Sequence, residues 1–207
     1  MKGGKKTLKL IFLSLTLLVP VAIYLFLRFF GHNQFNIPIY YSEGIPEDSA
    51  VCNQIHHLHL VDLSDISKER LLEGKLSVIA LLPSTESDIK NRVNKLSRVA
   101  SIFEDQDFLQ IVMIKQNMIG INDQGNDNQM IVPEIMKTIQ SDIEKVRDFA
   151  ICQLVILNFN GENLQSNDRV VLIDDLRRIR GYYRIDDFDD MDRLILEIKI
   201  LVNERNG

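Results

Sequence analysis

The chain has 207 residues, with 24 Lys and Arg against 29 Asp and Glu. This length suffices for one anchored domain of about 170 residues, which can bury its core without a metal or a set of disulfides. The acidic balance argues against a nucleic-acid partner, because nucleic-acid binders carry basic surfaces. No Gly-rich phosphate loop is present, and the four histidines all precede Leu60, so no Ser-His-Asp arrangement is visible. We therefore expect no enzymatic activity and no cofactor.

The first thirty residues are typical of a membrane anchor. An uncharged apolar run from Leu10 to Leu27 is long enough, at about 1.5 Å per residue, to cross most of the hydrocarbon core. Only Arg28 follows it directly, whereas four lysines precede it: Lys2, Lys5, Lys6 and Lys9. This asymmetry predicts a cytoplasmic amino terminus and a carboxyl-terminal domain on the far side. A cleaved signal peptide is the alternative, but R-F-F-G-H-N-Q-F after Leu27 offers no small-x-small cleavage site.

We therefore expect a single-pass protein of the inner (cell) membrane with a periplasmic, or otherwise extracytoplasmic, domain. The expected parts are a basic cytoplasmic segment at 1–9, an anchor at 10–30, an extended tether at 31–54 and a domain at 55–207. Residues 1–28 hold five of the 24 basic residues and no acidic ones, which leaves 19 basic against 29 acidic residues in the exported part. The exported part is thus strongly acidic.

The expected domain alternates strands and helices. We predict strands at 55–63, 76–82, 108–114 and 152–159, from short apolar runs bounded by polar residues. Apolar residues at helical spacing predict helices from Ile89 to Phe103, from Ile135 to Val146 after Pro133, and from Phe188 to Leu201. Segments 169–174 and 178–183 form an antiparallel hairpin. This order predicts an α/β domain with a mixed sheet and helices on both faces, which is the order of the thioredoxin fold.

The turn after the strand 76–82 is informative because of what it lacks. Thiol oxidoreductases and thiol copper carriers place paired cysteines there, since a helix N-terminus lowers the thiol pKa and favours the thiolate. Here the turn reads P-S-T-E-S-D, from Pro83 to Asp88, and contains no cysteine. The serines, threonine and acids are suited to capping the helix and interacting with its dipole.

Three motifs resemble membrane-anchored members of the SCO/SenC family. They are F-G-H-N-Q-F-N-I-P-I-Y-Y at 30–41, G-K-L-S-V-I-A at 74–80 and R-V-V-L-I-D-D-L-R-R-I-R-G-Y-Y-R at 169–184. The resemblance covers most of the chain from Phe30 on, and it is poor from Lys115 to Asn160. It implies a thioredoxin fold and, for the family, copper delivery to cytochrome oxidase or thiol reduction there.

The same resemblance argues against that copper chemistry in this chain. The two family cysteines fall on Glu86 and Lys90, and the family histidine falls near Ser166. These side chains cannot rebuild a Cu(I) site, because Cu(I) prefers thiolate, thioether or imidazole ligands and the ammonium of Lys90 would repel it. Arg177 also replaces the glycine that the family usually has in the hairpin turn.

A relocated metal site is the first alternative. Cys52, His56, His57 and His59 form a C-x-x-x-H-H-x-H cluster. In a strand, His57 and His59 would share one face while His56 pointed to the other, so we favour a polar strand edge over a metal site.

The second alternative is thiol-disulfide chemistry, which would require Cys52 and Cys152 to meet. They are the only cysteines, and an exported compartment is oxidising, so a disulfide between them is open. The sequence does not place them within bridging distance, and we favour Cys152 as a small buried residue. Our main hypothesis is a non-catalytic binding or assembly module near respiratory oxidase maturation, with a membrane protein as its partner.

Overall fold

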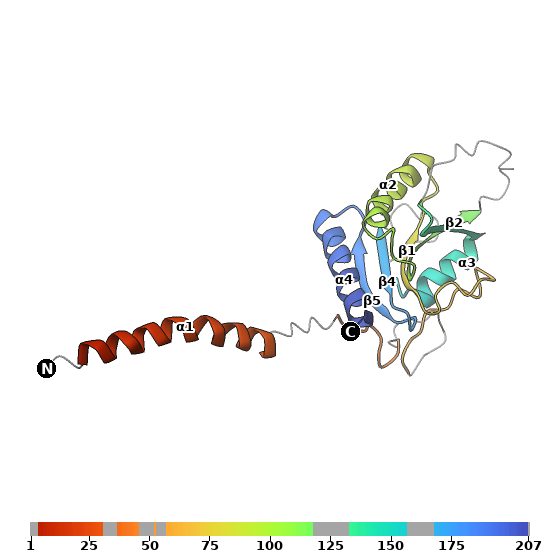
Figure 1. Cartoon of the computed structure of the whole chain (residues 1–207). Coiled ribbons are helices and arrows are strands. Elements are labelled where there is room, and N and C mark those ends of the chain that lie inside the picture. The colour runs from red at the N-terminus through yellow and green to blue at the C-terminus, as the bar shows by residue number, and fades with distance from the viewer. Residues whose placement is uncertain are drawn as a thin grey trace. The chain divides into compact units, whose positions relative to one another are not determined.

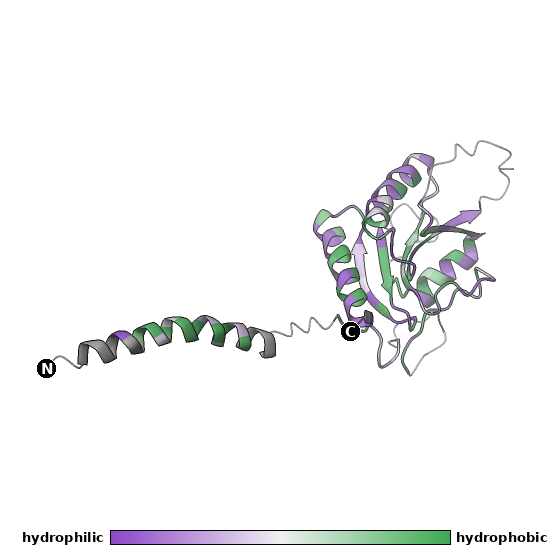
Figure 2. Ribbon diagram, in the orientation of Figure 1, coloured by the Kyte–Doolittle hydropathy of each residue, from purple (hydrophilic) through white to green (hydrophobic). Residues whose placement is uncertain are grey.

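The computed structural model describes residues 4–30, 37–45, 52, 57–117, 133–156 and 168–206. The chain divides into two compact units, residues 1–36 and 37–207. The first contains one helix, α1 (Gly4–Phe30), with Pro20 inside it. Its side chains from Phe12 to Phe26 are exposed, and Figure 2 shows how apolar most of them are. Within the described side chains, which in α1 are Lys9 and residues 12–26, no helix is long and apolar enough to cross a membrane.

The second unit is built on a five-stranded mixed sheet with the order β3-β2-β1-β4-β5. Its strands are β1 (Leu76–Leu81), β2 (Leu109–Asn117), β3 (Met136–Asp142), β4 (Arg169–Ile173) and β5 (Ile179–Arg184). β1, β2 and β3 run parallel, while β4 is antiparallel to both β1 and β5. Every residue of β1 is buried, as expected for a central strand covered on both faces.

Helices cover both faces of the sheet (Figure 1). α2 (Glu86–Ile102) and α4 (Phe188–Asn206) pack with Val78 and Ala80 of β1 into one hydrophobic core. Ile79 and Leu81 face a second core, which includes α3 (Ile143–Asp148) and the π-helix η1 (Phe149–Gln153). The alternation along β1 thus divides its side chains between two cores. This architecture is a thioredoxin-like α/β fold, and it confirms the predicted fold of the domain.

Three predicted elements are wrong in their described residues, two of them after β2. The helix expected from Ile135 to Val146 is β3 followed by the short α3, and the exposed side chains of Thr138, Gln140 and Asp142 alternate as in a strand. Ile139 and Val146 belong to different elements, and their spacing only imitated one helical face. The strand expected at 152–159 is also absent among its described residues, since Cys152 lies in η1 and residues 154–156 are irregular. The place beside β1 is taken by β4.

The segment before β1 is irregular and well packed. Residues 57–63, expected at the end of a strand, form no strand, although Val61 and Leu63 are buried in the second core. Residues 37–45, expected in the tether, also contact the domain. Ile37 and Ile45 are buried in the first and second core, and the amide of Tyr40 donates to the carbonyl of Ile179 at 2.9 Å. The amino-terminal segment therefore packs as part of the domain.

Candidate functional site

The turn from β1 into α2 is where this fold positions its reactive group, and here it presents exposed polar side chains. Leu82 and Pro83 are buried, and Thr85 occupies the N-cap position of α2 with an extended backbone. We define the α2 rim as Thr85, Glu86, Ser87 and Asp88, all of which are exposed. The two acids lie in the first turn of α2, where they stabilise the positive end of the helix dipole.

Two of the three positions at which the SCO/SenC resemblance places copper ligands are described, Glu86 and Lys90. Lys90 Nζ lies 3.0 Å from Glu86 Oε1, so the two side chains pair with each other one helical turn apart. Both are well exposed, which limits the pair to a few tenths of a kcal/mol. Ser166 lies outside the described residues. Among the residues that are described, no group of three His, Cys, Asp or Glu side chains could hold a metal ion.

Two buried polar residues hold the segment that leads into the α2 rim, and the sequence did not identify either of them. Arg92 donates from Nη1 to the carbonyl of Leu81 at 2.7 Å, which fixes the end of β1. Burial lowers the pKa of Arg92, while Asp186, Asp168 and Asp88 act against that shift. Gln116, the second residue, donates its amide to the hydroxyl of Ser84.

The missed residues left only weak signals in the sequence. Arg92 stands three residues after Ile89 and four before Leu96, so its charge falls beside the apolar stripe of α2. Gln116 follows the predicted strand and gave no comparable signal. The rim has neither a thiol nor a histidine, and it presents exposed hydroxyl and carboxylate groups.

The histidine cluster does not assemble the relocated metal site. His57 is exposed, His56 lies outside the described residues, and His59 is 1% exposed. His59 Nε2 donates to the carbonyl of Gln153 at 2.7 Å, and its Nδ1 is buried with no partner. The sulfur of Cys52 is bonded to that of Cys152, which removes the thiolate that the hypothesis needed. Of the described members, His59 is therefore packed in the domain interior and Cys52 is cross-linked, while His57 is exposed.

The structure joins Cys52 and Cys152 in a disulfide, with their Cα atoms 5.4 Å apart. The sequence analysis left this bridge open but favoured a small buried role for Cys152. The difference arises because Cys152 lies in η1, where it is half-buried, and not in a buried strand. The available signal was the presence of only two cysteines in a chain that the sequence predicts to be exported.

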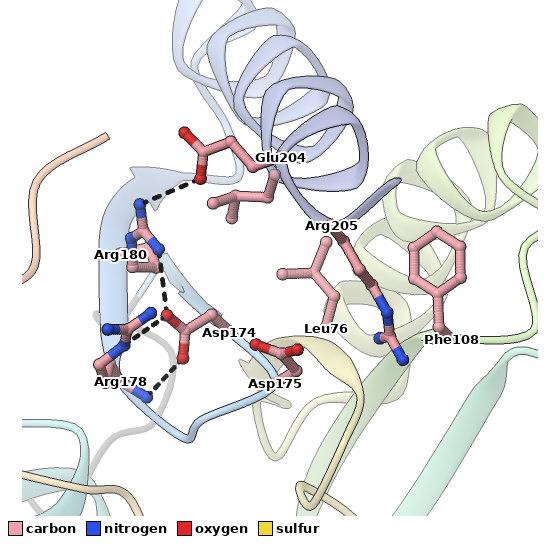
Figure 3. A pocket seen from close by; sticks show the side chains of 9 residues that line it. Leu76, Phe108, Asp174, Asp175, Arg178, Arg180, Glu204 and Arg205 are labelled. Carbon is pink, nitrogen blue, oxygen red and sulfur yellow. Dashed lines mark hydrogen bonds and ion pairs between the residues drawn. The ribbon is translucent and has the colours of Figure 1, made fainter. Parts of the chain in front are cut away.

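The β4–β5 turn is held by a buried ion network beside a small pocket (Figure 3). Asp174 Oδ2 accepts from Arg178 Nε at 2.7 Å and from Arg180 Nη1 at 3.1 Å. Its Oδ1 accepts the backbone amides of Leu176 and Arg178. Arg180 is only 6% exposed and also donates to the carbonyl of Ile37. The network binds the turn to the amino-terminal segment.

That pocket has a volume of about 250 Å³ and lies between this network and the carboxyl end of α4. Arg205 crosses its mouth, donating to the carbonyl of Gly74 at 3.0 Å and stacking 5.0 Å from the ring centroid of Phe108. Three arginines and three acids line it: Arg178, Arg180, Arg205, Asp174, Asp175 and Glu204. The formal charges in this lining therefore balance.

The two tyrosines of β5 point to opposite faces of the sheet, as the geometry of a strand requires. Tyr183 is 1% exposed, and its hydroxyl donates to Glu197 Oε2 at 2.5 Å. Tyr182 is half-buried, and its hydroxyl donates to the carbonyl of Leu154 at 2.8 Å. Burial raises the pKa of both phenols well above their ordinary value. Neither phenol can serve as a base near neutral pH.

Comparisons with solved structures found similar chains at low sequence identity. A SCO1/SenC family lipoprotein from Bacillus anthracis is similar over 63% of this chain and 83% of its own, with TM-score 0.48 and 12% identity. Bradyrhizobium japonicum ScoI with copper bound matches 62% and 85%, with TM-score 0.41 and 11% identity. Thiol peroxidase from Chromobacterium violaceum matches 84% and 96%, with TM-score 0.46 and 13% identity. No family model and no curated protein matches the chain. Similarities of this size carry no conclusion about function.

Proposed function

We propose that this protein is a non-catalytic binding module, a thioredoxin-like domain that docks a partner through the α2 rim. The observation that carries the proposal is the exposed row Thr85, Glu86, Ser87 and Asp88, at the place where this fold holds reactive thiols. Both cysteines of the chain are bonded to each other elsewhere. A surface without a nucleophile can still bind a partner.

The rim has two properties suited to docking. The segment that leads into it is anchored, because Arg92 binds the end of β1 and Gln116 binds Ser84. Anchored surfaces lose less entropy on binding. The rim also carries two acids, Glu86 and Asp88. Glu86 pairs with Lys90, and the salt bridges among the described residues include none of Asp88. A basic surface on the partner would complement it. The SCO/SenC resemblance of the sequence suggests that the partner belongs to respiratory oxidase maturation.

The proposal places the domain outside the cytoplasm on a single-pass anchor. It is supported by the uncharged sequence from Leu10 to Leu27 and by the lysines before it. The full-length protein should resist extraction from membranes by alkaline carbonate. Protease added to spheroplasts should digest the part after Arg28. Release into the carbonate wash would contradict the anchor, and protection of that part in unbroken spheroplasts would contradict the orientation.

Charge reversal tests the docking surface. The double variant Glu86→Lys and Asp88→Lys should lose the partner that co-purifies with the wild-type protein from solubilised membranes. Positive charge in the first turn opposes the helix dipole, so we expect a stability loss of about 1–2 kcal/mol and a retained fold. The matched control is Glu104→Lys with Asp105→Lys, two exposed acids just after the other end of α2. Equal co-purification by wild type, rim variant and control would refute docking at the rim.

A further inference from the structure

The disulfide closes onto an unusual helical element. Cys152 belongs to η1, a single-turn π-helix in which the amide of Leu154 donates to the carbonyl of Phe149 at 3.0 Å. Such elements are rare and frequently occur at functional sites. Cys52, 100 residues earlier in the chain, is half-buried like Cys152. The bridge is therefore neither deep in the core nor fully exposed.

The end of η1 is bound by side chains from other segments. The carbonyl of Gln153 accepts from His59 Nε2 at 2.7 Å, and the carbonyl of Leu154 accepts from the hydroxyl of Tyr182 at 2.8 Å. The side chain of Gln153 accepts the amide of Asp62 at 2.9 Å. A shift of η1 would therefore be felt at all three partners.

One of these partners belongs to a group of aromatic rings. We define the tyrosine cluster as Tyr40, Tyr41 and Tyr182, with His59 at its border. The rings of Tyr40 and Tyr182 meet edge to face with their centroids 5.3 Å apart. The ring centroid of Tyr41 lies 6.4 Å from those of Tyr40 and His59. Tyr40 is 36% exposed, so the cluster reaches the surface. The end of η1 is thus linked, through the hydroxyl of Tyr182, to the ring of Tyr40 at the surface.

The segment near Cys52 is also held without the bridge. The amide of His59 donates to the carbonyl of Tyr41 at 3.1 Å, and that of Val61 to the carbonyl of Arg177 at 2.9 Å. Val61 and Leu63 are 0% and 3% exposed. Opening the disulfide would therefore remove one attachment and leave the packing of residues 57–63 in place.

We propose that the Cys52–Cys152 bridge is a redox switch, opened in the folded protein by an external dithiol, and that its state sets the arrangement of the tyrosine cluster. A thiolate of the dithiol attacks one sulfur of the bridge, forms a mixed disulfide and releases the other cysteine, which takes up a proton. The second thiolate of the dithiol then displaces the remaining cysteine. The chain gains two electrons and two protons, and the dithiol becomes a disulfide. This inference uses no residue of the α2 rim.

Tyrosine emission and thiol trapping test the switch together in the full-length protein in mild detergent. The chain contains no tryptophan, so its emission comes from tyrosine. Reduced dithiothreitol should expose two alkylatable thiols, counted by intact mass, while the far-ultraviolet circular dichroism stays unchanged. Tyrosine emission should rise, and hydrogen exchange of the peptide covering residues 149–156 should become about tenfold faster, as for a local loss of one hydrogen bond. Oxidised dithiothreitol should reverse both changes.

Two variants separate a switch from a structural bridge. The double variant Cys52→Ser with Cys152→Ser should have the tyrosine emission of the reduced wild type, and dithiothreitol should not change it. Tyr182→Phe keeps the disulfide but removes the hydrogen bond to the carbonyl of Leu154. Dithiothreitol should still release both thiols in this variant, and its tyrosine emission should rise less than that of the wild type. Thiols that appear only after denaturation would overturn the proposal. So would reduction of the folded wild type that leaves both emission and exchange unchanged, and this test remains valid even if the serine variant fails to fold.

Discussion

Gly181 of β5 lies directly under the ring of Tyr183, and the substitution Gly181→Ala tests this packing. A Cβ at this position would lie 2.6 Å from Cζ and 2.9 Å from Cε2 of Tyr183, and closer still to its hydroxyl. The ring cannot easily move away, because it is buried, bonded to Glu197 and covered by Arg193 at 4.7 Å. Real Cβ atoms do not tolerate such distances, so the ring must shift.

The expected cost has two parts. Overpacking a core costs about 1–3 kcal/mol, and a lost hydrogen bond to a charged acceptor costs about 1.5–3 kcal/mol. We therefore expect Gly181→Ala to lower the free energy of unfolding by about 3 kcal/mol. Urea unfolding of the full-length protein in mild detergent, followed by circular dichroism, measures it.

A second background makes the test specific. With Tyr183→Leu already present, Gly181→Ala should be neutral or stabilise by about 0.5 kcal/mol, because alanine is favoured over glycine within a strand. Gly74→Ala serves as a control: the space around Gly74 is open but its φ is +70°, so its cost comes from the backbone and should be the same in both backgrounds. A loss below about 0.5 kcal/mol for Gly181→Ala in the wild type would refute the packing argument.

The remaining predictions concern the β4–β5 turn, metal binding and pH. Asp174→Ala should lower the free energy of unfolding in urea by about 3–5 kcal/mol, because it leaves Arg180 buried without its carboxylate, and a loss under about 1 kcal/mol would contradict this. Arg177 has φ +66°, so Arg177→Gly should stabilise by about 0.5–1 kcal/mol, whereas Arg177→Ala should be neutral. The full-length protein should show no tight Cu(I) binding against a bathocuproine-type chelator, and binding abolished by His57→Ala with His59→Ala would revive the relocated site. The hydrogen bond that the Arg184 amide donates lowers the pKa of the Asp190 carboxyl. Its contribution to stability is therefore fully present above the ordinary Asp pKa and is lost as pH falls through the lowered pKa. Asp190→Asn should weaken this loss of stability at acid pH, measured by urea unfolding at several pH values.

The elements that could be predicted from the sequence are those whose own hydrophobic pattern shows which of their faces are buried. The apolar runs that became β1 and β2, the hairpin of β4 and β5, and the amphipathic α2 and α4 each carried a clear local signal. β3 did not, because an edge strand buries few side chains and Ile139 repeated the helical spacing by coincidence. η1 could not be predicted either, since its shape depends on partners such as His59 and Tyr182 from distant parts of the chain.

The candidate site divides in the same way. The absence of cysteines from the turn at 83–88 could be recognised from the sequence, because this turn directly follows the clear apolar strand at 76–82. Arg92 and Asp174 were not identified as supports, because their roles depend on which backbone carbonyl or guanidinium lies opposite in three dimensions. The disulfide joins residues 100 positions apart, and no local pattern encodes that proximity.

The two edges of the sheet differ in a way that concerns folding and solubility. At β5, the amide of Tyr40 binds the carbonyl of Ile179, so the amino-terminal segment covers part of that edge. At β3, the described residues place β2 on one side and no strand on the other. An open edge can recruit a strand from another molecule, and polar or charged side chains oppose this. Lys137, Thr138, Gln140 and Asp142 supply them here, so replacing these residues with apolar ones should promote aggregation during refolding.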